Sequence, residues 1–168
     1  MGRRRHHSCA TQVDDMDELS HYDQSGAVRM VDISDKQPTQ RTARAHAFVR
    51  ISSQVLAKLP DNPKGNPLEV ARIAGIQGAK KTSELIPLCH PLALTHVGVD
   101  IRLEKEGVRI EASASTTGPT GVEMEALTAA AVAALTVYDM TKALDKRIEI
   151  QDLYLVEKTG GKSGDFRR

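Results

Sequence analysis

The stretch that decides the fold is LALTHVGVDIRLEKEGVRIEASAS, residues 92–115. In its first half apolar and polar residues alternate, so that one side of a predicted strand over residues 92–103 carries Val97, Val99, Ile101 and Leu103. Residues 104–107 (EKEG) predict a turn, and residues 108–115 predict a second strand. The stretch therefore predicts a strand, a turn and a returning strand.

Helical patterns flank this pair. Before it, Asn66 and Pro67 fit the N-cap and the first position of a helix whose apolar face runs over residues 68–79. After it, residues 116–121 (TTGPTG) predict a break in the sheet, and residues 122–145 predict a long helix rich in alanine. The middle of that helix is apolar on all sides, which indicates burial, in part against another subunit.

The remaining elements complete the pattern. Residues 42–51 and 148–156 predict strands, and Ser52 and Ser53 fit the N-cap of a short helix that ends at Leu59. Residues 60–67 hold three prolines and a glycine and predict a loop. The order helix, strand, strand, helix, strand predicts an α+β fold, a ferredoxin-like sandwich with an antiparallel sheet packed against helices. It does not fit a doubly wound parallel sheet.

Composition limits the class of protein. The 168 residues carry a formal net charge of +1, which does not favour a nucleic-acid or membrane partner. The two cysteines, Cys9 and Cys89, form no disulfide framework and indicate a reduced, cytoplasmic compartment. The longest uncharged apolar run, residues 126–137, is too short to span a bilayer. Residues 1–28 lack periodicity and predict a flexible tail, so we expect the folded domain at residues 29–168, ending in a glycine-rich tail.

The sequence GGKS at residues 160–163 is similar to the end of a phosphate-binding P-loop. A P-loop needs another glycine five residues before Gly161, where this chain has Val156, and a helix after the serine. Neither requirement is met, so a P-loop NTPase is excluded.

Residues 85–91 (LIPLCHP) are a first candidate site. Pro87 and Pro91 stiffen the connection that presents Cys89 and His90. A histidine here can titrate near neutral pH or hydrogen-bond a phosphate; the alternative is a purely structural role. The spacings CxxC and HxxxH do not occur nearby, so no metal site is predicted.

The end of the long helix is a second candidate. Asp139 and Lys142 share a helix face at positions i and i+3, and a desolvated lysine beside a carboxylate can act as an acid or base near neutral pH. Glu125 lies about 21 Å from Asp139 along a straight helix. Either a triphosphate extends between them or two subunits build the site, and we favour the subunit interface. Lys64 and Lys158, both beside glycine in loops, are the lysines best placed to close over a triphosphate.

Six segments together resemble the molybdenum cofactor biosynthesis protein C family, the cyclic pyranopterin monophosphate synthases. They are MVDIS (30–34), ARIAGIQ (71–77), LIPLCHP (85–91), TGVEMEALT (120–128), YDM (138–140) and GGKSGD (160–165). The resemblance implies a ferredoxin-like subunit in a homohexamer, a trimer of dimers, with active sites at the dimer interfaces. It implies a phosphorus–oxygen lyase that converts 3′,8-cyclo-7,8-dihydroguanosine 5′-triphosphate to cyclic pyranopterin monophosphate and releases pyrophosphate.

The resemblance also implies roles for single residues. The catalytic residues would be Asp139, Lys142 and Lys64. The substrate-binding residues would be Leu88, Cys89, His90, Glu123, Met124, Glu125, Lys80, Arg41 and Lys158. A radical enzyme acting on GTP would supply the substrate. No cofactor is expected, since ring opening and phosphate closure need proton transfer, although Mg²⁺ can accompany a triphosphate.

Two readings from other classes stay open at this point. A regulatory module would bind a small ligand without changing it, as ferredoxin-like domains often do. A structural subunit would use the apolar helix only for assembly. Without the resemblance, the residues alone predict a phosphate-binding α+β domain.

Overall fold

A computed structural model describes residues 21–168 except residues 24 and 64. Most of the predicted tail and the predicted catalytic Lys64 therefore lie outside the described residues. Contacts divide the chain into two units, residues 1–31 and 32–168. In the first, Tyr22 and Val28 form an isolated antiparallel bridge, and the Asp23 carboxylate accepts hydrogen bonds from the backbone of Ser25 and Ala27.

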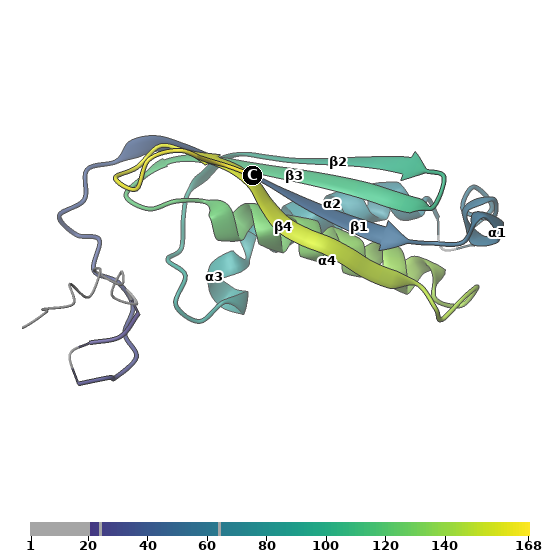
Figure 1. Ribbon diagram of the computed structural model, residues 1–168, viewed down its shortest axis with the longest axis horizontal. Coiled ribbons are helices and arrows are strands. Elements are labelled where there is room, and N and C mark those ends of the chain that lie inside the picture. Colours follow the sequence, from purple (N-terminus) through teal and green to yellow (C-terminus); the bar gives the residue numbers. More distant parts are fainter. Residues whose placement is uncertain (1–20, 24, 64) are drawn as a thin grey trace, which may run out of the picture. The chain divides into compact units, whose positions relative to one another are not determined.

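The second unit is an antiparallel sheet with helices packed against it. Its elements in chain order are β1 (Thr39–Arg50), α1 (Ser53–Leu56), α2 (Pro67–Lys80), α3 (Thr82–Leu85), β2 (Leu94–Glu104), β3 (Gly107–Gly118), α4 (Glu123–Thr141), β4 (Glu149–Thr159) and β5 (Phe166–Arg167). The strand order is β2-β3-β1-β4-β5, and every pairing in it is antiparallel (Figure 1). The predicted α+β fold is confirmed, including the strand, turn and strand over residues 92–115.

Several predicted boundaries were wrong. β3 continues to Gly118, which pairs with Thr39, so residues 116–118 extend the sheet instead of breaking it. α4 ends at Thr141 and not at Asp145: residues 142–144 form a turn, in which the backbone N–H of Leu144 donates to the carbonyl oxygen of Thr141 at 2.9 Å. α1 ends at Leu56, three residues before the predicted end at Leu59.

Of the two N-caps predicted from the sequence, Asn66 for α2 and Ser52 for α1, only the first is confirmed. Asn66 Oδ1 accepts hydrogen bonds from the backbone N–H groups of Leu68 (3.0 Å) and Glu69 (3.4 Å), so it caps α2 as expected. Ser52 occupies the N-cap position of α1, but its side chain makes no capping hydrogen bond.

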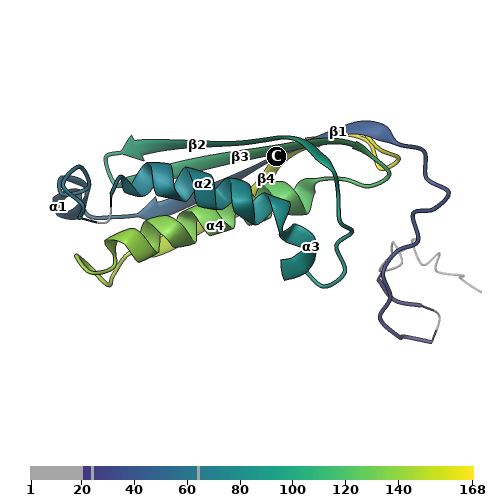
Figure 2. The ribbon, with the colours of Figure 1, turned by 180° about the vertical axis from the view of Figure 1, so that it is seen from behind.

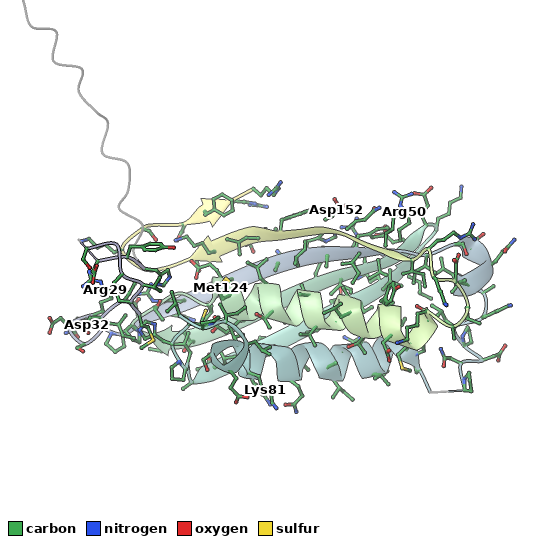
Figure 3. The ribbon with its side chains drawn as sticks, turned by 90° about the horizontal axis from the view of Figure 1, so that it is seen from below. Arg29, Asp32, Arg50, Lys81, Met124 and Asp152 are labelled. Atoms are coloured by element: carbon green, nitrogen blue, oxygen red, sulfur yellow. The ribbon has the colours of Figure 1, made fainter. Side chains whose placement is uncertain are left out.

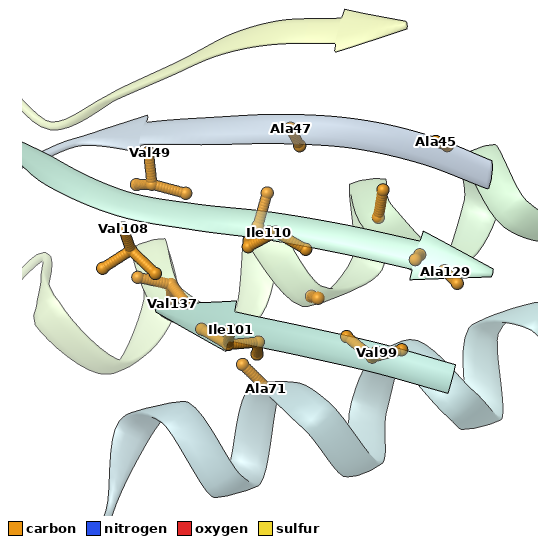
Figure 4. Packing of buried hydrophobic residues seen from close by; sticks show 14 of the residues in the cluster. Ala45, Ala47, Val49, Ala71, Val99, Ile101, Val108, Ile110, Ala129 and Val137 are labelled. Atoms are coloured by element: carbon orange, nitrogen blue, oxygen red, sulfur yellow. The ribbon is translucent and has the colours of Figure 1, made fainter. Parts of the chain in front are cut away.

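The core is built from small side chains. Alternate residues of β1 and β3 face the helices in register, pairing Ala43 with Ala114, Ala45 with Ala112, Ala47 with Ile110 and Val49 with Val108 (Figure 4). The facing side of α4 carries five fully buried alanines at positions 126, 129, 130, 133 and 134. Alanine on both layers lets the helix lie close to the sheet, which explains how a chain with 3% aromatic residues forms a closed core.

Both long helices lie on the same face of the sheet, as the two opposite views show (Figures 1 and 2). Lys81, just after the end of α2, and Met124, near the start of α4, lie at the same end of the helical layer (Figure 3). The helices therefore run antiparallel. Among the residues that the structure describes, no helix has the length and apolar character needed to cross a membrane.

The single chain buries only part of α4, so the expected burial of the rest against another subunit stays a prediction. Leu135 is 58% exposed, and Ile73 on α2 is 62% exposed. The sheet and α2 cover only part of the circumference of α4, so a stripe that includes Leu135 and Asp139 faces outward.

Candidate active site

A cavity of about 850 Å³ opens beside the N-terminal end of α4. β1, β4 and α4 contribute Arg41, Lys158 and Glu123 to its wall, and the wall is completed by Lys36, Gln37, Thr39, Pro119, Thr120, Gly121, Gly161, Lys162 and Ser163. Four of the lining side chains are cationic and one is a carboxylate. The cavity is therefore suited to an anion that carries several charges.

Arg41 is fixed in this wall by backbone groups. Its Nε donates to the carbonyl oxygen of Gly118 at 3.0 Å, and its Nη2 donates to that of Pro119 at 3.3 Å. Its Nη1 lies over Gly161, where an added Cβ would come within 2.0 Å of that nitrogen. The glycine thus makes room for the guanidinium, which is held in place before any ligand binds.

Lys158 has two partners in the cavity. Its Nζ donates to Ser163 Oγ at 2.6 Å and lies 3.6 Å from Glu123 Oε1. The Lys158 side chain is 17% exposed, so its charge is less screened than that of a surface lysine. The hydrogen bond to Ser163, in the loop after β4, therefore orients the Lys158 ammonium group before a phosphate enters the cavity.

Glu125 is the buried carboxyl group of the site. It follows Glu123 by two residues in the first turn of α4 and is only 4% exposed. Burial raises the pKa of Glu125 to about 6, and the nearby charge of Glu123 adds to the rise. A carboxyl group with such a pKa can hold or release a proton close to neutral pH.

The segment Leu88–His90 is half-buried, and its Cys89 lies near the Glu125 carboxyl group. Burial raises the pKa of the Cys89 thiol, and the charge of Glu125 raises it further. A thiol with a raised pKa is a poor nucleophile. The structure therefore places Cys89 near Glu125 but gives its sulfur no catalytic character.

Asp32 lies near His90, and the sequence motifs did not assign it to the site. Hydrogen bonds from the side chain and backbone of Ser34 lower the pKa of Asp32, and His90 contributes a smaller lowering through its charge. The signal for it was the pattern Asp-x-Ser at residues 32–34, which favours a carboxylate held by a local turn.

Two further lysines line the cavity, Lys36 and Lys162, and neither was predicted as a site residue. Lys36 had no sequence signal, because it belongs to no motif and reaches the cavity only through the path of the chain before β1. Lys162 belongs to the GGKS sequence that was compared with a P-loop, but it was not assigned to the site. Two of the predicted substrate-binding residues that do not line this cavity are Met124, which is 37% exposed at the start of α4, and Lys80, which is exposed at the end of α2.

The second group of predicted residues lies at the opposite end of α4. Lys142 Nζ and Asp139 Oδ1 form an ion pair at 2.7 Å, with side chains 53% and 58% exposed. The expected desolvation of Lys142 is not found in the single chain. The hydrogen bond and the charge of Asp139 instead raise the pKa of Lys142, which keeps the ammonium form.

The proline-containing loop approaches this same end. Asn62 Nδ2 donates to the carbonyl oxygen of Met140 at 2.9 Å. A cavity of about 240 Å³ between the loop and the helix is lined by Lys58, Asp61, Asn62, Pro63, Met140, Ala143 and Leu144. The loop that contains Lys64 is thus anchored beside the residues that follow Asp139, although Lys64 itself is outside the described residues.

The arrangement forms two half-sites. The first group, which we name the phosphate half-site for the role we propose, is the cavity around Arg41, Glu123 and Lys158, together with Glu125 and the Leu88–His90 segment. The second group, which we name the proton-transfer half-site for the role we propose, is the Asp139–Lys142 pair with the adjoining loop. They lie at opposite ends of one continuous helix, α4. One chain therefore does not bring them together.

The loop at residues 160–165 joins β4 to β5 and leads into a strand rather than a helix, so the exclusion of a P-loop is confirmed. Within the described part of the chain, no cluster of three or more His, Cys, Asp or Glu side chains is arranged to hold a metal ion.

Comparison with known proteins gives the family. A relative from Corynebacterium efficiens called cyclic pyranopterin monophosphate synthase is 57% identical over 153 residues, covering 90% of this chain and 99% of its own. Relatives of the same name from Staphylococcus carnosus and Desulfatibacillum aliphaticivorans are 52% and 56% identical, each covering at least 90% of this chain and 98% of their own. The pattern of the MoaC family matches residues 30–161, and the chain belongs to that family.

Proposed function

We propose that this chain is a cyclic pyranopterin monophosphate synthase of molybdenum cofactor biosynthesis. In this proposal it converts 3′,8-cyclo-7,8-dihydroguanosine 5′-triphosphate to the cyclic monophosphate and releases pyrophosphate. The names of its relatives support the activity. The observation that carries the proposal in the structure is the cationic cavity at the start of α4, which suits a triphosphate.

The cavity supplies the charge that such a reaction needs. A triphosphate brings several negative charges, and cyclisation at the first phosphate expels the other two as pyrophosphate. Arg41 and Lys158, with Lys36 and Lys162 in the same wall, can neutralise that developing charge. Arg41 needs little reorganisation because two carbonyl groups already hold it.

Proton transfer is assigned to the other half-site. Opening the imidazole-derived ring and rebuilding it as a pyrazine requires protons to move at nitrogen and carbon atoms. In the proposal, Asp139 is the acid/base, Lys142 is its charged partner, and Lys64 is a third catalytic group. Leu88, Cys89, His90, Met124, Glu125 and Lys80 complete the binding surface.

The two half-sites would meet between subunits. We propose a homohexamer built as a trimer of dimers, in which the phosphate half-site of one chain faces the proton-transfer half-site of its partner. Two exposed apolar side chains support a helix-face contact, Leu135 on α4 and Ile73 on α2. Burial against a partner would also supply the desolvation of Lys142 that the single chain lacks.

The proposed chemistry moves protons and a phosphoryl group but no electrons, so it calls for no redox cofactor. Mg²⁺ can accompany the triphosphate as a counter-ion. An upstream radical enzyme that acts on GTP would supply the substrate. A cytoplasmic location completes the proposal.

The test is a product assay. Purified protein is incubated with the cyclic dihydro-GTP substrate, and pyrophosphate and the cyclic pterin are followed by mass spectrometry. Product should form with the wild type and fall by at least about 10²-fold with Asp139→Ala or Lys142→Ala. Intact substrate after incubation with folded, oligomeric wild-type protein would instead support a regulatory binding module.

A further inference from the structure

β4, β5 and the loop between them form a hairpin that carries one wall of the phosphate half-site. Glu157 and Lys158 of β4 pair with Arg167 and Phe166 of β5. The intervening loop places Gly161, Lys162 and Ser163 on the cavity. Lys158 therefore sits at the base of the hairpin, and its ammonium group is bonded to Ser163 in the loop.

The loop is closed by a carboxylate that is outside the cavity lining. Asp165 Oδ1 accepts a hydrogen bond from the backbone N–H of Gly160 at 3.0 Å, across the open end of the loop. The backbone N–H of Gly164 also donates to the carbonyl oxygen of Gly161 at 3.3 Å. These bonds fix the loop that orients Ser163, the hydrogen-bond partner of Lys158.

The returning strand is anchored on the sheet. The Arg168 guanidinium lies over the ring of Tyr154, 4.4 Å from its centroid, and the backbone N–H of Arg168 donates to the carbonyl oxygen of Val156 at 2.9 Å. The Tyr154 ring in turn packs against His46 of β1, with centroids 5.0 Å apart. The end of the hairpin is thus tied to two strands of the sheet.

We propose that Asp165 and Arg168 are positioning residues for phosphate binding, a role that rests on the proposed function of the cavity. Asp165 acts as a hydrogen-bond acceptor that closes the loop, and Arg168 holds β5 on β4. Together they keep Lys158 and Ser163 in place before the triphosphate arrives. The negative charge of Asp165 is not needed, because only its acceptor oxygen makes the contact.

The test is titration of the full-length protein with inorganic pyrophosphate and with GTP, followed calorimetrically, together with steady-state kinetics. Asp165→Ala should weaken binding of both probes and raise KM about three- to ten-fold, the effect of one ordinary hydrogen bond, with kcat changed less than about two-fold. Asp165→Asn keeps an acceptor oxygen and should restore wild-type binding. Arg168→Ala should act like Asp165→Ala, whereas the control Arg167→Ala removes the same charge one residue earlier without removing the ring contact.

The outcomes separate this inference from the proposed function. If Lys158→Ala weakens pyrophosphate binding but Asp165→Ala does not, the positioning role is wrong and the phosphate site stands. If Lys158→Ala binds pyrophosphate like the wild type, both are wrong. If Asp165→Asn is as impaired as Asp165→Ala, the proposal that Asp165 acts through its acceptor oxygen is wrong. If kcat and the melting temperature fall with no change in KM, Asp165 has only a structural role.

Discussion

Glu125 and Asp139 stand at opposite ends of the uninterrupted helix α4, about 21 Å apart at 1.5 Å per residue. Glu125 is buried beside the Leu88–His90 segment, whereas Asp139 is exposed and paired with Lys142. The side chains of Glu125 and Asp139 are too short to span this distance. The two residues of one chain therefore cannot touch the same reacting atom, and in the proposed site the two ends of α4 come from two copies of the chain.

The burial of Glu125 predicts a specific pH dependence of stability. Its pKa in the folded protein, about 6, lies above its ordinary value of 4.5, so the folded state favours the protonated form. This contribution is fully present below pH 4.5 and is lost as the pH rises through 6. Glu125→Gln should therefore stabilise the fold by about 2 kcal/mol at pH 8 and make no difference at pH 4.

Urea unfolding of the wild type and of Glu125→Gln across this pH range measures the effect. The exposed Glu106→Gln is the control and should show no such dependence. A stability difference between wild type and Glu125→Gln that stays constant from pH 4 to pH 8 would show that burial does not control this carboxyl group.

Close packing of the two long helices predicts intolerance at Gly75. A Cβ added there would lie 2.9 Å from the carbonyl oxygen of Ala129 and 3.2 Å from the Cβ of Ala133. Gly75→Val should lower the free energy of unfolding by about 2 kcal/mol or more, because the backbone of α4 must shift. Gln77→Val, on the exposed side of the same helix, should change it by less than about 0.5 kcal/mol. Equal stabilities for the two variants in chemical denaturation would contradict the packing described for α2 and α4.

The hairpin loop predicts a difference between two of its glycines. Gly160 has φ +84° and an added Cβ would lie 2.3 Å from the carbonyl oxygen of Gln40, whereas Gly164 has φ +72° and open space around it. Gly164→Ala should cost about 1 kcal/mol from its backbone conformation alone. Gly160→Ala should cost more and should also weaken pyrophosphate binding, since it displaces the loop from β1. Thermal unfolding and calorimetric titration of both variants provide the comparison, and equal effects would rule out the close contact with β1.

Local patterns in the sequence predicted most of the fold. Alternation over residues 92–115 and the Asn66–Pro67 cap correspond to β2, β3 and the start of α2. The extension of β3 to Gly118 was missed because glycine and threonine there are held by pairing with β1, a contact that no local pattern contains. β5 was missed for the same reason, since two residues acquire a strand conformation only by pairing with β4.

The site was predictable in part. The motif at residues 120–128 located Glu123, and the resemblance added Arg41 and Lys158; the structure gathers all three in one cavity. They did not give the raised pKa of Glu125, because burial of a carboxyl group depends on packing around the start of α4. They also did not show that Lys142 is exposed in the single chain. An apolar helix has the same sequence pattern whether the rest of its own chain or a partner subunit covers it, so the pattern does not tell which of the two buries its neighbours.

The most direct test of the two-chain site is activity after mixing two inactive variants. Asp139→Ala disables the proton-transfer half-site and His90→Ala the phosphate half-site, so a mixed dimer keeps one intact site. Random subunit exchange should restore about a quarter of wild-type activity. A mixture of Asp139→Ala with Lys142→Ala, both from the same half-site, should stay inactive. Failure of the first mixture to regain activity, with exchange demonstrated by mass spectrometry of tagged subunits, would contradict a site built from both ends of α4.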